Sequence, residues 1–571
     1  MHSPASPSQT DTTSHNSPHH PITRQPSPPV TRSKNHIFKP NPKYALHTLI
    51  SSGLPIAPTT YKQAAAIPEW RQAMLDEFQA LKKNHTWSLV PSTSTQNIIG
   101  CKWVFRVKQN PDGSIARYKA RLVAKGFHQR PGVDFTDTFS PVVKPATVRV
   151  ILTLAISQNW HIHQLDVNNA FLQGTLTDRV YMQQPQGFTD PMLPDHVCLL
   201  HKALYGLRQA PRAWYCELRT FLLQSGFQNS KSDVSLFTFT AHGSILFLLV
   251  YVDDIIITAN NAPVLRSFIT RLATRFSLKD LGALSYFLGL EAIRTSHGLH
   301  LTQHKYIRDL LSRTHMQDAS PVPTPLSPDA PLSLSDGSSP HDATEYRSVI
   351  GALQYLSFTR PDISFVVNKL SQYMHRPTTR HWEAIKRVLR YLKGTPHFGI
   401  FISAHTPLTL HAYADADWAG DIDTRHSTSA YVVFLGRNPI SWSSKKQSTV
   451  ARSSTEAEYR AIASASAELT WLRNLLHELR ITLKQSPTIF CDNISATYVC
   501  VNPVLHSRMK HVAIDFHFVR EQIAQGLLRV SHVHTKDQLA DSLTKPLARS
   551  LFLSHRSKLG ILPGPLSLAG A

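Results

Sequence analysis

Hydrophobic residues recur along the chain at two periods, and the changes of period predict its helices and strands. From about Tyr61 the apolar positions fall three or four residues apart, which predicts an amphipathic helix; these positions are Trp70, Met74, Phe78 and Leu81. Residues 101–108 and 116–126 flank the turn Asn110-Pro-Asp-Gly113, and we predict that they form two strands. A long helix is predicted at 455–479, within a later region of strands.

Two Pro- and Ser-rich stretches divide the chain into segments. The first lies in a leader at 1–57, which we expect to be disordered because it cannot bury enough apolar area to offset its ordering entropy. The second is a linker at 316–343, which follows a mixed region of helices and strands at 58–315. The remaining expected segments are a helical connection at 344–405, a strand-and-helix domain at 406–548 and a tail at 549–571. The sequence therefore predicts an α+β multidomain protein.

The sharpest chemical signal is the run Tyr251-Val-Asp-Asp254. It lies between the apolar segments 245–250 and 255–257, and this pattern predicts a β-hairpin with two adjacent carboxylates. Adjacent carboxylates in so apolar a frame repel each other and lose hydration. A bound divalent cation would remove that conflict, and an ordinary acidic turn is an equal alternative for these four residues taken alone.

A third aspartate, Asp166, ends a short strand-like run, and the aromatic residue Phe171 follows five positions later. In two-metal phosphoryl transfer, cations about 4 Å apart hold the attacking and leaving oxygens. Mg²⁺ prefers oxygen ligands and keeps waters or phosphates in its shell. Asp166, Asp253 and Asp254 have the chemistry that such a site needs. Phe171 by itself would be interpreted as a core aromatic.

Four further carboxylates follow the second Pro/Ser-rich stretch, at the ends of predicted strands and on predicted helices; they are Asp415, Glu458, Asp492 and Asp541. Each has a structural alternative. Glu458 has capping-box spacing from Thr455, Asp492 could cap a helix, and Asp541 could be an exposed helical charge. Asp417 is a rival to Asp415, although the strand-ending position favours Asp415.

The charge balance favours a polyanionic partner. Lys and Arg number 60 against 38 Asp and Glu, a formal net charge of +22, and neutralising phosphates releases condensed counterions. The alternative is a basic surface without a partner. Five cysteines without a short Cys-x-x-Cys pair argue against a disulfide framework and a zinc site. The first residues are polar and indicate no signal peptide. The longest apolar run, 244–258, contains Asp253 and Asp254, so we expect no membrane partner.

These motifs carry a specific resemblance. Asp166 with Phe171, followed by Tyr251-Val-Asp-Asp254, resembles the palm of reverse transcriptases. Three longer blocks are similar to the copia-type branch of retrotransposon Pol polyproteins; they are Lys119–Gly126, Leu204–Trp214 and Tyr346–Tyr355. The similarity runs from about Ala66 to Lys545. It implies a right-hand polymerase of fingers, palm and thumb, then a connection and an α/β ribonuclease H-like domain.

The resemblance also implies roles for single residues. Asp166, Asp253 and Asp254 would hold two Mg²⁺ ions, with Mn²⁺ as an alternative. Phe171 would place its ring against the sugar of the incoming nucleotide, where a 2′-hydroxyl would collide. The other implied substrate-binding residues are Lys119 and Arg121 at the triphosphate, Gln209 beside the template and new base pair, Tyr251, and Gly289 at the primer end. A solvated strand face is an even alternative for Lys119 and Arg121. Tyr205 departs from the pattern, since retroviral enzymes usually carry Gln there.

The order of the later acids resembles ribonuclease H. This implies that Asp415, Glu458, Asp492 and Asp541 are catalytic and bind a second pair of Mg²⁺ ions. His534 stands only seven residues before Asp541, so the His-bearing loop of retroviral nucleases would be short here. The basic run Arg508–His511 would contact the hybrid backbone or form a solvated helix face.

The implied activity is DNA synthesis on RNA, followed by degradation of the RNA strand. The implied partners are an RNA template, a DNA primer, an RNA–DNA hybrid and deoxynucleoside triphosphates, held through backbone and shape. The implied location is cytoplasmic, including virus-like particles, with nuclear entry as a further step. A catalytically inactive, nucleic-acid-binding remnant is the alternative. The presence of all seven candidate carboxylates favours the enzyme.

Overall fold

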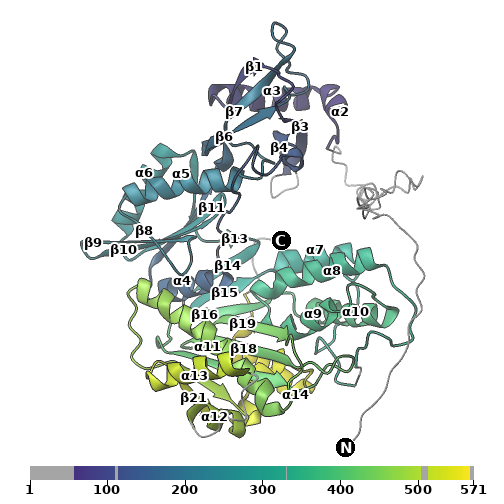
Figure 1. Ribbon diagram of the computed structural model, residues 1–571, viewed down its shortest axis with the longest axis vertical. Coiled ribbons are helices and arrows are strands. Elements are labelled where there is room, and N and C mark those ends of the chain that lie inside the picture. The colour runs from purple at the N-terminus through teal and green to yellow at the C-terminus, as the bar shows by residue number, and fades with distance from the viewer. Residues whose placement is uncertain (1–56, 110–113, 330, 503–511, 566–571) are drawn as a thin grey trace, which may run out of the picture. The chain divides into compact units, whose positions relative to one another are not determined.

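The computed structural model describes residues 57–109, 114–329, 331–502 and 512–565. Those from Thr59 onward belong to one compact unit (Figure 1). Most of the predicted leader, the turn Asn110–Gly113 and the basic run Arg508–His511 lie outside the described residues. None of the helices in the described ranges has the length and apolarity that a membrane crossing requires.

In the first described layer a helix packs against a hairpin. Trp70 is 1% exposed, and its ring centroid lies 5.3 Å from that of Phe105 and 4.8 Å from that of Tyr118. The apolar spacing of the sequence therefore predicted the buried helix face correctly. The strands make a β3–β4 hairpin and a sheet in the order β1-β7-β6-β2. The elements are α2 Tyr61–Ala65, α3 Pro68–Lys83, β1 Trp87–Pro91, β2 Ile98–Ile99, β3 Cys101–Gln109, β4 Ile115–Ala124, η2 Gly126–His128, β6 Thr175–Met182 and β7 His196–Lys202.

A six-stranded sheet in the order β12-β5-β11-β10-β9-β8 contains the predicted acidic hairpin. Its apolar runs are continuous because both faces are buried. Leu248 packs into a core with residues of α5 and α6, whereas its neighbour Leu249 packs into a second core with residues of α4. The elements are α4 Pro145–Ser157, β5 His161–Val167, η3 Ala170–Gln173, α5 Ala210–Gln224, β8 Gln228–Asn229, β9 Leu236–Ala241, β10 Ser244–Tyr251, β11 Asp254–Ala259, α6 Ala262–Arg275 and β12 Leu278–Ala283.

A third sheet, in the order β13-β14-β15-β16-β22, corrects two expected segments. The connection at 344–405 is not entirely helical, because Phe398–Ser403 forms β16 and pairs with β15. Residues 549–571 are not only a tail, because Arg549–Lys558 forms α14 and Ile561–Pro563 forms β22. Ile561 and Phe552 are buried, which explains why this segment is ordered. The other elements are β13 Tyr286–Phe287, β14 Leu290–Thr295, β15 Gly298–Thr302, α7 His304–Arg313, α8 Ala343–Tyr355, η4 Leu356–Phe358, η5 Pro361–Ile363, α9 Ser364–Ser371 and α10 Thr379–Gly394.

The last sheet has the order β19-β18-β17-β20-β21, with β17, β20 and β21 parallel to one another and β18 and β19 antiparallel. The helix predicted at 455–479 is confirmed as α11, Ser454–Glu478. It packs along β17 and β18 (Figure 1). The remaining elements are β17 Leu410–Asp417, β18 Thr428–Leu435, β19 Asn438–Lys446, β20 Thr488–Cys491, α12 Ile494–Val501, α13 Ala513–Ala524, β21 Arg529–His532, η8 Thr535–Asp537 and η9 Leu539–Leu543.

A buried arginine joins the six-stranded sheet's helix α4 to this last sheet. Arg149 is 5% exposed and donates from Nε to the Ile440 carbonyl at 2.8 Å and from Nη1 to the Phe358 carbonyl at 2.9 Å. Its guanidinium also lies 3.8 Å from the ring centroid of Trp442. Burial lowers the pKa of Arg149 to about 9, and the charge of Glu468 opposes this shift. A buried cation with these partners ties the elements together.

Candidate active sites

The first candidate site lies where β5 meets the β10–β11 hairpin. Asp254, the first residue of β11, is the direct antiparallel partner of Asp166 on β5. The Val167 amide donates to the Asp253 carbonyl at 3.0 Å. Residues directly opposite on neighbouring strands point to the same face of a sheet. Three aspartates that are far apart in the sequence are therefore neighbours along the backbone.

The electrostatics of this site favour a cation. Burial, together with the charges of Asp253 and Asp166, raises the pKa of Asp254 to about 6. All three residues are half-buried. Their carboxylate oxygens do not form a group within 4.8 Å of one another, unlike two other groups in the described part of the chain. The donor types and their mutual repulsion fit Mg²⁺.

The hairpin turn is held from outside the sheet. Val252 has φ +55, a left-handed conformation that is strained for a β-branched residue. Trp214 of α5 is 1% exposed and donates from Nε1 to the Val252 carbonyl at 2.6 Å. The block that contains Trp214 therefore supports the turn that presents Asp253.

Beside these acids, Phe171 and Arg121 both contact the ring of Tyr205. The ring centroids of Phe171 and Tyr205 are 4.9 Å apart at 64°, and the Arg121 guanidinium lies 4.6 Å from the Tyr205 centroid. Phe171 is half-buried on η3 and packs at the margin of a core, so it keeps part of its surface exposed. Arg121 Nε is buried and has no hydrogen-bond partner among the described residues.

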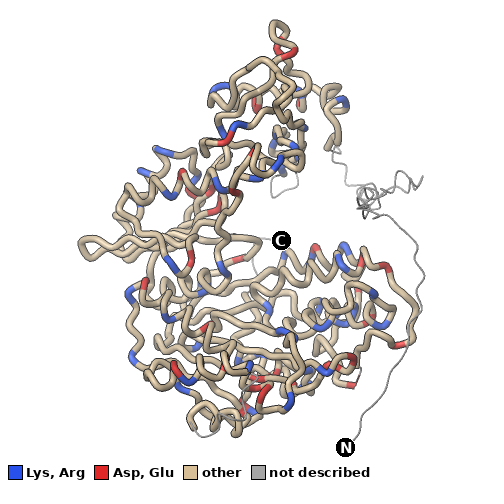
Figure 2. The backbone as a smooth tube through the Cα atoms, viewed as in Figure 1, with Lys and Arg blue, Asp and Glu red and all other residues tan. Residues whose placement is uncertain are grey.

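The β3–β4 hairpin pairs like charges across its strands. Arg106 lies opposite Lys119, and Lys108 lies opposite Arg117. Burial lowers the pKa of Lys119, and the neighbouring charges of Arg121 and Arg117 lower it further. Like charges placed directly opposite are destabilising, so this face favours an anionic ligand over the plain solvated strand. Figure 2 shows Lys and Arg spread over the whole described chain as well.

Gln209 does not face open space, which corrects the expected substrate contact. It is 3% exposed, it accepts from Gln129 Nε2 at 3.0 Å, and it donates to the Asp134 carbonyl at 2.9 Å. The structure favours a bracing role for Gln209, because a nucleotide contact would break these bonds.

Gly289 lies in a tight turn between β13 and β14. It has φ +71, and a Cβ added there would lie 2.4 Å from the Tyr355 hydroxyl oxygen. That hydroxyl donates to the Leu288 carbonyl at 2.6 Å. A hydrogen bond from Tyr355 of α8 therefore holds the turn that we expect at the primer end. Tyr251 is half-buried at the end of β10 and packs against a core.

The second candidate site gathers all four predicted acids. Asp415 on β17, Asp492 after β20 and Asp541 on η9 each offer an oxygen, and these atoms lie within 4.8 Å of one another. Asp415 and Asp541 are 2% exposed. The Thr544 hydroxyl donates to Asp415, and Lys545 Nζ lies 2.8 Å from Asp541 Oδ1. Burial, together with the charge of Asp415, raises the pKa of Asp541 to about 7, although Lys545 opposes the shift.

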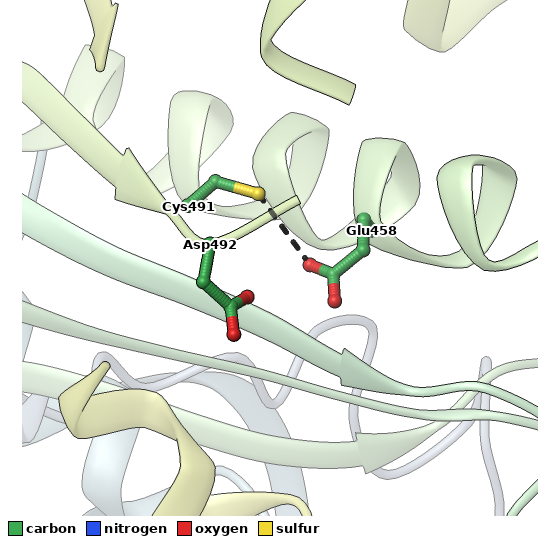
Figure 3. Close-up of side chains that lie close together, drawn as sticks. All are labelled: Glu458, Cys491 and Asp492. Carbon is green, nitrogen blue, oxygen red and sulfur yellow. Dashed lines mark hydrogen bonds between the residues drawn. The ribbon is translucent and has the colours of Figure 1, made fainter. Parts of the chain in front are cut away.

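Glu458 approaches the same place from α11, beside a cysteine. Figure 3 shows the Glu458 and Asp492 carboxylates turned toward each other, with Cys491 next to both. Cys491 Sγ donates to Glu458 Oε2 at 3.6 Å. Burial, together with the charges of Asp415 and Asp492, raises the pKa of Glu458 to about 10. Four crowded carboxylates with one ammonium fit a doubly charged cation.

The structural alternatives for these acids are wrong. The N-cap of α11 is Ser453, which accepts from the Glu456 amide, so Glu458 is not part of a capping box. Asn493, not Asp492, caps α12. Asp541 is buried and therefore is not an exposed charge. Asp417, the rival to Asp415, is absent from the groups of clustered donors among the described residues.

Sequence reasoning missed the residues that accompany the acids. Thr544 and Lys545 follow Asp541 by three and four positions, and this helical spacing is the signal that could have identified them. The Thr535 hydroxyl, which donates to Asp492 Oδ2 at 3.0 Å, carries no such signal. His532 and His534 are exposed.

The chain is similar to a family of reverse transcriptases and to transposon proteins. Residues 84–328 match the family model for reverse transcriptase (RNA-dependent DNA polymerase). The chain is 57% identical over 538 residues to the retrovirus-related Pol polyprotein from transposon RE1 of Arabidopsis thaliana, covering 94% of this chain and 37% of that protein. It is 35% identical over 300 residues to a putative transposon Ty5-1 protein of Saccharomyces cerevisiae, covering 52% of this chain and 97% of that protein.

Among solved structures, the foamy viral protease-reverse transcriptase in complex with RNA/DNA hybrid matches with a TM-score of 0.44 at 14% identity. The match covers 82% of this chain and 54% of that chain. The chain spans little more than a third of the length of the RE1 polyprotein.

Proposed function

The chain belongs to the copia-type retrotransposon Pol family, with a reverse transcriptase domain, and we propose that it copies RNA into DNA and degrades the RNA strand of the resulting hybrid. The pairing of Asp166 with Asp254 carries the polymerase half of this proposal. The cluster of Asp415, Asp492 and Asp541 carries the nuclease half. In this proposal the six-stranded sheet is the palm, the β3–β4 hairpin belongs to the fingers, and the third sheet begins the thumb.

At the polymerase site, Asp166, Asp253 and Asp254 would hold Mg²⁺. When bound, the metal would supply electrostatic stabilisation of the charge that develops on the reacting phosphate and the leaving pyrophosphate. Arg121 and Lys119 would orient the triphosphate, since both lie on one strand of a strongly basic hairpin. The ring of Phe171 would lie against the sugar. The Gly289 turn, fastened by Tyr355, would keep the primer end in line.

At the nuclease site, Asp415, Glu458, Asp492 and Asp541 would hold the second set of Mg²⁺ ions. Thr544 holds the Asp415 carboxylate in place, and Thr535 does the same for Asp492. Lys545 neutralises part of the acidic charge in the metal-free protein. These contacts keep the carboxylates from rotating apart, and this preorganisation lowers the cost of assembling the site.

The proposed partners are an RNA template, a DNA primer, an RNA–DNA hybrid and deoxynucleoside triphosphates. The net charge of +22 supports a nucleic-acid partner. We also propose a cytoplasmic site of action, within virus-like particles, before nuclear entry.

A primer-extension assay tests both halves at once, with a labelled RNA template, a DNA primer, deoxynucleotides and Mg²⁺. Wild-type protein should extend the primer and shorten the template. Asp253→Asn should abolish extension and leave cleavage of a preformed hybrid intact. Asp280→Asn is the matched control, because Asp280 is an exposed acid on β12 of the same sheet. Extension by Asp253→Asn at the wild-type rate would reject the polymerase assignment. Nucleic-acid binding without either activity would instead identify an inactive remnant.

A further inference from the structure

Tyr205 contacts two residues that the proposed function assigns to the nucleotide. It follows β7, in the loop that leads to α5. Its ring and the Phe171 ring lie edge to face, with a centroid distance of 4.9 Å and an interplanar angle of 64°, and the Arg121 guanidinium lies 4.6 Å from the Tyr205 ring centroid. Phe171 comes from η3 and Arg121 from β4. Tyr205 therefore connects side chains from two separate elements.

The backbone that carries Tyr205 has little freedom. Its carbonyl accepts from the Ala124 amide at 2.8 Å. The next residue, Gly206, has φ +92, and a Cβ there would lie 2.1 Å from the Ala124 carbonyl oxygen. A Cβ on Gly126 would lie 2.0 Å from the Gly206 carbonyl oxygen. Only glycines permit this approach, so the backbone of the loop is held against the end of β4.

Tyr205 lies close to the acidic site. Burial raises the pKa of Tyr205, the Arg121 charge opposes the shift, and the charges of Asp253 and Asp166 add to it. The phenol ring is thus near the same carboxylates that would hold the metal. A nucleotide with its triphosphate at Arg121 and its sugar beside Phe171 would pass along the edge of the Tyr205 ring.

We propose that Tyr205 is a positioning residue that holds Phe171 and Arg121 at a fixed separation and thereby sets the preference for deoxyribonucleotides over ribonucleotides. This inference rests on the proposed function, because it assigns a substrate preference to the same site. Without the ring, Phe171 would gain room to turn away from the sugar. Arg121 would lose its cation–π partner as well. Tyr205→Leu should therefore weaken sugar discrimination, and Tyr205→Phe, which keeps the ring, should not.

The test measures discrimination in two ways on the full chain. Steady-state primer extension gives kcat/KM for a deoxynucleotide and for the matching ribonucleotide. Ternary-complex formation on a dideoxy-terminated primer gives the dissociation constants of both nucleotides without chemistry. The ratio of deoxynucleotide to ribonucleotide should fall about tenfold in Tyr205→Leu, the order expected for loss of one aromatic pair. It should stay unchanged in Tyr205→Phe.

Two further variants keep the inference testable. Tyr205→Gln, a polar replacement without a ring, should behave like Tyr205→Leu. The double variant Tyr205→Leu/Phe171→Val should discriminate no less than Phe171→Val alone, because both changes act through one ring. Cleavage of a preformed hybrid at the distant acids reports that each variant is folded.

The outcomes separate the two claims. Wild-type discrimination in Tyr205→Leu and Tyr205→Gln, with hybrid cleavage retained, overturns the positioning role and leaves the polymerase assignment in place. Additive losses in the double variant also overturn it. If wild-type protein binds nucleotides selectively on the terminated primer but extends no primer, the proposed activity fails. The positioning role is then judged on the binding ratios alone.

Discussion

Glu458→Gln should make the metal-free protein more stable, by an amount that grows with pH. Glu458 is 6% exposed, and burial followed by the charges of Asp415 and Asp492 raises its pKa to about 10. In the unfolded chain the group titrates at its ordinary value of 4.5. Between these two values the folded protein binds a proton that the unfolded protein releases. Stability therefore falls as the pH rises through this range, by at most about 1.4 kcal/mol per pH unit.

Glutamine has nearly the shape of the protonated side chain and does not titrate. The two proteins should have similar free energies of unfolding at pH 5, and the variant should exceed the wild type by up to about 3 kcal/mol at pH 7. Mg²⁺ should reduce this difference. A ligand at ten times its dissociation constant stabilises the wild type by about 1.4 kcal/mol, and a variant lacking one carboxylate should gain less.

The assay is denaturant unfolding at pH 5, 6 and 7, first in chelator and then with Mg²⁺. Glu521→Gln is the control, because Glu521 is an exposed acid on α13 of the same region. It should leave the pH dependence of unfolding unchanged. The reasoning is wrong if the free-energy difference between Glu458→Gln and wild type stays constant from pH 5 to 7 in chelator. It is also wrong if Mg²⁺ stabilises both proteins equally.

Three further changes have expected outcomes. Phe171→Val should raise ribonucleotide incorporation at least about tenfold in primer extension, and unchanged sugar selectivity would count against a gate. Asp492→Asn should lower hybrid cleavage about 100-fold or more and spare DNA synthesis; persistent cleavage of a labelled hybrid would reject the site. Gly289→Ala should lower the thermal midpoint and slow primer extension. The new methyl group would clash with the Tyr355 hydroxyl, and the φ of +71 is strained for alanine. Gly282 has a similar φ of +79, but a Cβ added there has no neighbouring atom within 4 Å. An equal loss of stability and extension in Gly282→Ala would therefore exclude the clash with Tyr355 as the cause.

The sequence predicted elements wherever a strong local pattern existed. The apolar runs around Asp253 and Asp254 predicted the hairpin correctly, because strands buried on both faces leave a continuous apolar record. Both ends of the helix α11 were predicted within one residue, because this helix also has a strong local pattern. The fit of Asp166 beside Asp254 depends on strand pairing over almost ninety positions, which no local pattern records.

The errors have physical causes too. The alternative of a capping box at Thr455 is wrong, because Ser453 also has a hydroxyl and is the residue with extended backbone that caps α11. Gln209 stands in a block typical of the family, and that resemblance could not show that its side-chain amide is already hydrogen-bonded inside the protein. Lys545 was missed because a single lysine near an acid is common on helices. The sequence showed Tyr205 only as a departure from the family pattern. Its ring contacts with Phe171 and Arg121 are visible only in the structure.

The three residues of β22 close one side of β16, which lies more than 150 positions earlier in the chain. A recombinant protein shortened before Ile561 would expose a row of unpaired amides and carbonyls along β16. Such an open edge recruits strands from other molecules. Expression trials that trim the C-terminus at the last predicted acid should therefore yield aggregates, whereas a tag placed after Pro563 should leave the protein soluble.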